Sequence, residues 1–174
     1  MNVMRALLIA SIMLTGTGCG QRLSPSTPPG EENNVTPIAD DDAQVNRAIA
    51  KAQSTAPDFL TALAHPSTDQ GDFAVIKRCL GDGSKEDLWL SDVTYDGQLI
   101  HGKIDNIPEY VTSLHEGDEQ TVAPADVIDW KYLDHGKLVG GYTIRAYYAE
   151  SSPQQKAQIL EGGHFTAADM VPNY

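Results

Sequence analysis

Five side chains in this sequence have the types from which a reactive or binding site can be built: Asp92, His101, Asp129, Trp130 and Tyr142. A carboxylate beside a histidine can support acid–base catalysis, because it orients the imidazole and stabilises its charge. An acidic and aromatic sheet surface can instead bind a protein or peptide. Two hypotheses follow, an uncharacterised hydrolase-like enzyme and a non-enzymatic interaction module. A pocket that holds at least two of Asp92, His101 and Asp129 would favour the enzyme, and their dispersal over a convex sheet would favour binding.

The Asp129–Trp130 pair also has a structural interpretation. Trp130 is large enough to anchor a hairpin against the core, and Asp129 can accept backbone N–H groups at a strand start. The following Gly140–Gly141 pair suits a bulge or a close backbone approach. Aromatic residues at strand period are usually core, so the sequence favours a structural role. A binding role stays open if Trp130 lies at a groove mouth beside Tyr142.

The remaining polar motifs predict neither a metal site nor a cofactor. The stretch His115–Glu119, HEGDE, lacks the second histidine of a zinc-binding H-E-x-x-H motif and contains a turn at Gly117. The stretch Gly81–Lys85, GDGSK, lacks the spacing of a phosphate-binding loop and reads as a turn. The G-x-S-x-G motif of a nucleophile elbow does not occur in the sequence. We therefore expect no catalytic residue of a familiar class, no metal and no cofactor.

Cys79 could be a reactive thiol, because Lys77 and Arg78 are close in sequence and positive charge lowers a thiol pKa. On a strand, however, Arg78 points to the opposite face, while Cys79 shares a face with Phe73 and Val75. The alternation favours a buried, unreactive cysteine.

Two helices are expected at the start of the folded part, and one at its end. Apolar residues recur at helical spacing from Val45 to Ala52, and Pro57 interrupts the pattern. A second short helix should run from Pro57 to Ala64 and end before His65, because the residue that precedes a proline is pushed out of the helical region. The C-terminal helix has Ser152 as its cap, Pro153 at its first position and Gly162 as its stop signal.

The clearest strand signal is Asp96–Gly97 between two apolar runs, which predicts a two-residue type I′ hairpin turn. Pairing outward from that turn places Val93 opposite Ile100 and Trp89 opposite Ile104. These residues share one face of the hairpin, so we expect them to form a core face.

The other face of this hairpin is expected to carry Asp92 directly opposite His101. A second hairpin should run from Trp130 to Tyr148 with His135–Gly136 at its tip. The predicted fold is α+β: an N-terminal helix pair, an antiparallel sheet built from two hairpins, and a C-terminal helix.

With these elements placed, the motif DVIDWKYLDHGKLVGGYTIR resembles the YegJ-like family of bacterial domains of unknown function, DUF2314. The resemblance extends upstream to AIAKAQSTAPDFLTAL, DFAVIKRCL, EDLWLSDV and GKIDNIPEYV, and downstream to SSPQQKAQI. Lys131 departs from the family pattern, which has an apolar residue after the DW pair, and His135 replaces an acidic or polar residue. The resemblance implies a small α+β domain that is often exported. It implies no known activity and no catalytic residues.

The N-terminus has the order of a secretory signal peptide, with one positive charge at Arg5, a short apolar run and small residues. The motif GTGC, which ends at Cys19, is similar to a bacterial lipobox, although Gly16 stands where leucine is usual and an ordinary signal peptidase could also cut before Cys19. We expect residues 1–18 to be a signal peptide, residues 19–40 to carry a lipid on Cys19 and form a flexible linker, and residues 41–174 to form one domain. Gly20 follows the cysteine where an inner-membrane retention signal has aspartate, so the periplasmic side of the outer membrane is favoured.

Acidic residues outnumber basic residues by 24 to 12, which gives the chain a formal charge of −12. Removing the predicted signal peptide, whose only charged residue is Arg5, makes the charge −13. Such a charge disfavours nucleic acid as a partner and permits a basic protein or peptide. It is also what a merely soluble acidic surface would show. Beyond the lipid anchor in the membrane, a basic protein or peptide is therefore the partner class that we expect.

Overall fold

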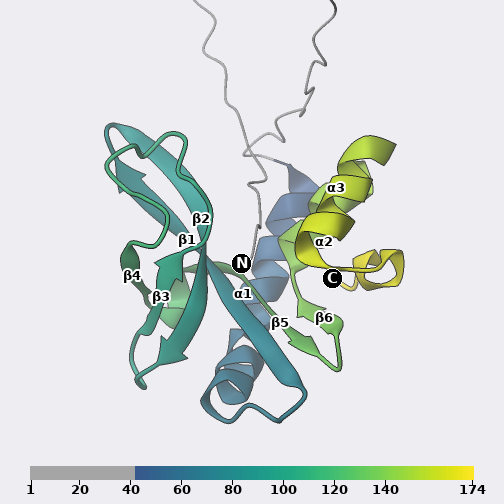
Figure 1. The fold of residues 1–174 in the computed structure, drawn as a ribbon, viewed down its shortest axis with the longest axis horizontal. Coiled ribbons are helices and arrows are strands. Elements are labelled where there is room, and N and C mark those ends of the chain that lie inside the picture. The colour runs from purple at the N-terminus through teal and green to yellow at the C-terminus, as the bar shows by residue number, and fades with distance from the viewer. Residues whose placement is uncertain (1–41) are drawn as a thin grey trace, which may run out of the picture.

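The computed structural model describes residues 42–174, so the predicted signal peptide, Cys19 and the linker to Asp40 lie outside the described residues. Six strands form one sheet in the order β4-β3-β2-β1-β5-β6, and every neighbouring pair is antiparallel (Figure 1). The predicted α+β class is confirmed. In chain order the elements are α1 (Ala43–Ala64), β1 (Gln70–Gly81), β2 (Ser84–Tyr95), β3 (Ile100–Ile104), β4 (Glu119–Val122), η1 (Pro124–Asp126), β5 (Val127–Asp134), β6 (Lys137–Gly140), α2 (Tyr142–Glu150), α3 (Pro153–Gly163) and η2 (Ala167–Met170).

The N-terminal helix is single, and the prediction of a helix pair was wrong. Pro57 lies inside α1, and the helix continues through it to Ala64. A proline in a helix interior costs about 3 kcal/mol, because it removes a hydrogen bond and crowds the preceding turn. One continuous buried stripe that includes Ala48, Ala52, Ala56 and Phe59 packs against the sheet and offsets that cost.

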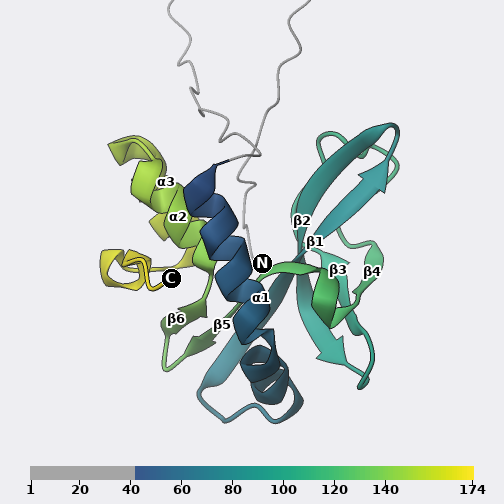
Figure 2. The ribbon, with the colours of Figure 1, turned by 180° about the vertical axis from the view of Figure 1, so that it is seen from behind.

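The main core lies between α1 and one face of the sheet. The side chains of Val75, Leu88, Leu90 and Ile100 are fully buried on this face, together with Phe59 from the helix. Figure 2 shows α1 crossing β5 and β1, with α2 beside it on the side away from β3 and β4. A second, smaller core joins β6 to the C-terminal segment through Leu138, Ile159 and Met170. Within residues 42–174, no helix is both long and apolar enough to span a membrane.

Two tight turns set the long strands. Asp82 and Gly83 join β1 to β2, and His135 and Gly136 join β5 to β6. All four residues have positive φ, as type I′ turns require. The predicted tip at His135–Gly136 and the predicted turn in the stretch GDGSK are both confirmed.

The hairpin at Asp96–Gly97 exists, but its predicted register was wrong. The pairs are Tyr95 with Ile100 and Leu90 with Ile104, so the loop has four residues instead of two. The carboxylate of Asp96 accepts hydrogen bonds from the N–H groups of Gln98 and Leu99 and thereby stabilises the longer loop.

A bulge between Ser91 and Thr94, where Asp92 has φ 52°, adds one residue to β2. The bulge places Leu90 in the core, where the sequence had placed Trp89. Burial of Val93, Ile100 and Ile104 is confirmed.

The second hairpin is shorter than predicted, because it ends at Gly140 and the residues from Tyr142 to Glu150 form α2. The predicted cap of α3 is confirmed. Ser152 and Gln155 form a reciprocal capping box, with Pro153 in the first turn. The helix passes the predicted stop at Gly162 and ends after Gly163, where His164 adopts a left-handed conformation.

Candidate functional site

Trp130 lies in the core, which agrees with the structural interpretation. Only 3% of its surface is exposed, and its indole N–H donates a hydrogen bond of 2.9 Å to the carbonyl oxygen of Ala52 in α1. Its ring stacks on Phe59 at a centroid distance of 5.2 Å and meets Tyr142 edge-on at 5.7 Å. A side chain at Gly140 would overlap the Trp130 ring, so this glycine provides the close backbone approach that the sequence suggested. Trp130 and Tyr142 therefore fix α1 and α2 to the sheet.

Asp129 is fully buried and organises the start of α2. Its carboxylate accepts hydrogen bonds from the backbone N–H groups of Trp130, Tyr142 and Thr143 and from the Thr143 hydroxyl. The predicted acceptance of backbone N–H groups is confirmed, although two of the three come from the first turn of a helix. Burial raises the pKa of Asp129 to about 6, and these hydrogen bonds oppose the rise.

Asp92 and His101 do not form the predicted cross-strand pair. His101 lies opposite Thr94, and Asp92 occupies the bulge. The imidazole Nε2 of His101 instead lies 2.8 Å from a carboxylate oxygen of Asp96 on the exposed surface. The extra residue in β2 shifts the register, so the proposed acid–base pair is not assembled.

Lys131 is buried on β5, with 7% of its surface exposed. Its ammonium lies 5.6 Å from the ring centroid of Trp89 and 6.0 Å from that of Phe165, which are cation–π distances. Burial lowers the pKa of Lys131, and Asp72 and Asp105 oppose that change by their negative charge. Two aromatic rings therefore accommodate a lysine at a position where the family pattern has an apolar residue.

The other motifs have structural roles. Cys79 is buried, and burial is the main cause of its raised pKa, which agrees with an unreactive thiol. His115 is exposed in a turn that Asp118 stabilises by accepting its backbone N–H. Among residues 42–174, no group of three or more His, Cys, Asp or Glu side chains is placed to hold a metal ion.

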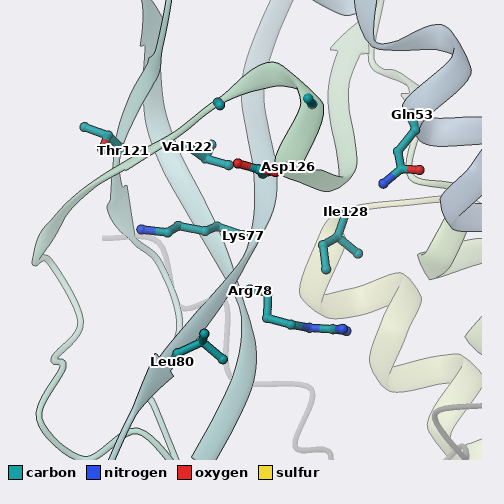
Figure 3. A pocket seen from close by; sticks show the side chains of 10 residues that line it. Gln53, Lys77, Arg78, Leu80, Thr121, Val122, Asp126 and Ile128 are labelled. Atoms are coloured by element: carbon teal, nitrogen blue, oxygen red, sulfur yellow. The ribbon is translucent and has the colours of Figure 1, made fainter.

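A hollow of about 450 Å³ lies beside the outer half of β1, and we call it the β1 hollow (Figure 3). The connection from β4 to β5, which includes η1, forms one wall, and α1 contributes a single residue. None of Asp92, His101 and Asp129 lines it. The lining residues are Gln53, Lys77, Arg78, Leu80, Thr121, Val122, Ala123, Ala125, Asp126 and Ile128.

Three charged side chains line the β1 hollow, two basic and one acidic: Lys77, Arg78 and Asp126. The ammonium of Lys77 donates a hydrogen bond of 2.8 Å to the side chain of Gln120. The guanidinium of Arg78 makes two hydrogen bonds of 2.7 Å to Asp87, and Figure 3 shows Lys77 and Arg78 extending to opposite sides of β1. Leu80 is 77% exposed and, with the partly buried Ile128, adds apolar surface to the lining. The β1 hollow therefore offers a nearly neutral, partly apolar surface.

Comparison with known proteins identifies the family. A family model described as an uncharacterized protein conserved in bacteria, DUF2314, matches residues 42–165. The chain belongs to this family. The DUF2314 match spans α1 to the residues that follow α3, so it includes the Asp129–Trp130 pair and every residue of the β1 hollow. The resemblance seen in the sequence is thus confirmed.

Two relatives are similar to this chain over about two thirds of its length. The chain is 31% identical over 124 residues to the uncharacterized protein YegJ of Escherichia coli, which covers 69% of this chain and 80% of that protein. It is 29% identical over 125 residues to a putative ankyrin repeat protein of Neisseria meningitidis, covering 67% of this chain but 49% of that protein. No solved structure matches the chain.

Sequence reasoning missed the β1 hollow, because its residues come from three separate segments of the DUF2314 domain. One signal was available in the sequence: Leu80 is an apolar residue next to the turn at Asp82–Gly83 on the face opposite Cys79. Alternation on a strand predicts that such a residue leaves the core side. Its neighbours across the hollow could not be predicted, because they depend on the path from β4 to β5.

Proposed function

We propose that this protein is a non-enzymatic interaction module of the bacterial cell envelope and that its partner is a basic protein or peptide. The observation that carries the proposal is the β1 hollow, an open surface with an exposed Leu80 on a protein of formal charge −12. Apolar surface from Leu80 and Ile128 within one hollow suits contact with another polypeptide. The excess of acidic residues over the chain as a whole would steer a positively charged partner towards the protein.

The separation of Asp92, His101 and Asp129 supports binding over catalysis. Asp129 uses both carboxylate oxygens to hold α2, and His101 pairs with Asp96 on the surface. The enzyme hypothesis required at least two of the three groups in one pocket, and the β1 hollow contains none of them.

The envelope location rests on the N-terminal sequence. A lipid on Cys19 would hold the mature chain at a membrane surface, since bacterial lipoproteins carry more than one acyl chain and two or more chains anchor stably. The linker to Asp40 is rich in proline, serine and threonine, and some 20 such residues span about 25 Å on average. The domain would then sit clear of the bilayer, on the periplasmic side and with the outer membrane favoured.

Capture from an envelope extract at increasing salt tests the partner class. We expect basic proteins or peptides whose association slows as salt rises, because the Debye length falls from about 30 Å at 0.01 M to about 8 Å at 0.15 M. DNA and RNA should not be retained. A main partner that is acidic and insensitive to salt, or binding of nucleic acid in the micromolar range at physiological salt, would contradict the proposal.

A further inference from the structure

The last residues of β1, from Arg78 to Gly81, pair with another strand on one side only. On their other side, beside the β1 hollow, they form an edge of the sheet. β1 pairs with β2 as far as Gly81, but it pairs with β5 only as far as Lys77. Gly81 and Ser84 are the pair of residues that flank the two-residue turn. In hairpins with such a turn, the flanking pair forms two hydrogen bonds, one from each backbone N–H to the carbonyl oxygen of the other residue. Because successive residues of a strand direct their backbone groups to alternate sides, the N–H and C=O of Leu80 point away from β2.

The opposite edge of the same hairpin is covered. The carboxylate of Glu86 in β2 accepts hydrogen bonds from the backbone N–H groups of Glu109, Tyr110 and Val111. Val111 is fully buried against Gly81, so the segment after β3 packs onto this end of the hairpin. Protection of an edge in this way is usual in soluble proteins, because an open edge is a template for another strand. At Leu80 the residues from 42 to 174 supply no equivalent cover.

The chemistry of the β1 hollow fits an extended, uncharged segment. Arg78 forms an ion pair with Asp87, and the formal charges of the other two charged lining residues, Lys77 and Asp126, are opposite, so the lining has little net charge. Apolar contact is available from Leu80 and Ile128. Beyond the β1 hollow, the acidic excess of the chain favours positive charge on the flanks of the same segment.

We propose that the β1 hollow binds one extended segment of the basic partner, which adds as a strand to the edge of β1 at Leu80. The segment is uncharged and partly apolar where it crosses the β1 hollow and carries lysine or arginine on either side. Strand addition takes its affinity from main-chain hydrogen bonds and its selectivity from alternate side chains. This inference rests on the proposed function and names the mode of binding.

The test uses the full chain with Cys19→Ser, which removes the acylation site, and a synthetic peptide, acetyl-Lys-Lys-Val-Thr-Val-Thr-Val-Lys-Lys-amide. Two control peptides replace the central valine by proline, which cannot donate a main-chain hydrogen bond, or all four lysines by glutamate. The variant Ala125→Trp fills the β1 hollow at an exposed lining residue, and Ala168→Trp places the same side chain on an exposed site in η2. Affinity is measured by fluorescence anisotropy, and the amide of Leu80 is followed by NMR.

We expect the lysine-flanked peptide to bind at low salt, to shift the Leu80 amide and to protect it from exchange. Ala125→Trp should weaken binding at least about tenfold, which is about 1.4 kcal/mol, while Ala168→Trp leaves it unchanged. If the proline peptide binds equally well, or Ala125→Trp has no effect, strand addition is overturned while attraction to a basic partner survives. If the glutamate-flanked peptide binds better than the lysine-flanked one, the proposed function fails as well.

Discussion

Ionisation of Asp129 should make the stability of this protein depend on pH in a direction opposite to that of most carboxylates. The folded-state pKa is raised to about 6, from 3.8 for an exposed aspartate, because the side chain is fully buried. Well below pH 3.8 both the folded and the unfolded chain hold this proton. Between pH 4 and 6 only the folded chain holds it, so the free energy of unfolding falls as the pH rises. A difference of about two pKa units corresponds to about 3 kcal/mol.

The variant Asp129→Asn isolates this contribution. Asparagine has the same shape and does not ionise, but its amide nitrogen cannot accept the hydrogen bonds that Thr143 donates. The variant should therefore be destabilised at every pH, by about 1–3 kcal/mol from the unmade hydrogen bonds alone. Relative to the wild-type protein, its deficit should be about 2 kcal/mol larger at pH 4 than at pH 7, since ionisation weakens only the wild type and the unfolded chain is already partly ionised at pH 4.

Urea unfolding monitored by tryptophan fluorescence measures this difference across pH 2–7. The control is Asp96→Asn, because hydrogen bonds from Leu99, His101 and Gln98 lower the pKa of Asp96 to about 2. Asp96 therefore stabilises the fold above pH 4 and loses that effect as the pH falls towards 2, which is the opposite sign. A deficit of Asp129→Asn that is the same at pH 4 and pH 7 would refute the assignment of a raised pKa to Asp129.

Three further predictions concern single residues. Trp130→Ala should lower the free energy of unfolding by about 3–5 kcal/mol, measured by thermal melting, and an unchanged midpoint would mean that Trp130 is not part of the core. Gly140→Ala should cost more than Gly136→Ala: both glycines have φ near 70°, but only at Gly140 does a new methyl group overlap Trp130. Equal costs in urea unfolding would show that the close approach is unimportant. Cys19→Ser should move the protein from the membrane fraction to the soluble periplasm in cell fractionation, and membrane association that persists would exclude a lipid on Cys19.

The candidate site could be predicted from the sequence only in part. The structural interpretation of Trp130 rested on its strand period, and its burial against Phe59 confirms it. The pairing of Asp92 with His101 was wrong, because one bulge residue in β2 changes which side chains lie opposite each other. A bulge has no reliable local signature when an aspartate adopts the left-handed conformation in place of a glycine.

The sequence by itself determined the α+β class, the hairpin tips and the cap of α3. These features depend on residues that are a few positions apart in the chain. Examples are the turn at His135–Gly136, the capping box at Ser152 and the strand alternation that buries Cys79. Local geometry restricts such segments to a few conformations before any long-range contact forms.

Only the tertiary structure decided the length of α1, the start of α2 and the position of the β1 hollow. Pro57 remains inside α1 because the helix packs its whole buried stripe against the sheet. The segment that begins at Tyr142 becomes a helix where Asp129, 13 residues earlier, accepts its first N–H groups. The β1 hollow forms because β5 stops pairing with β1 at Lys77, while β2 continues to Gly81. These outcomes depend on contacts between distant residues, whose free energy exceeds the local preferences of the chain.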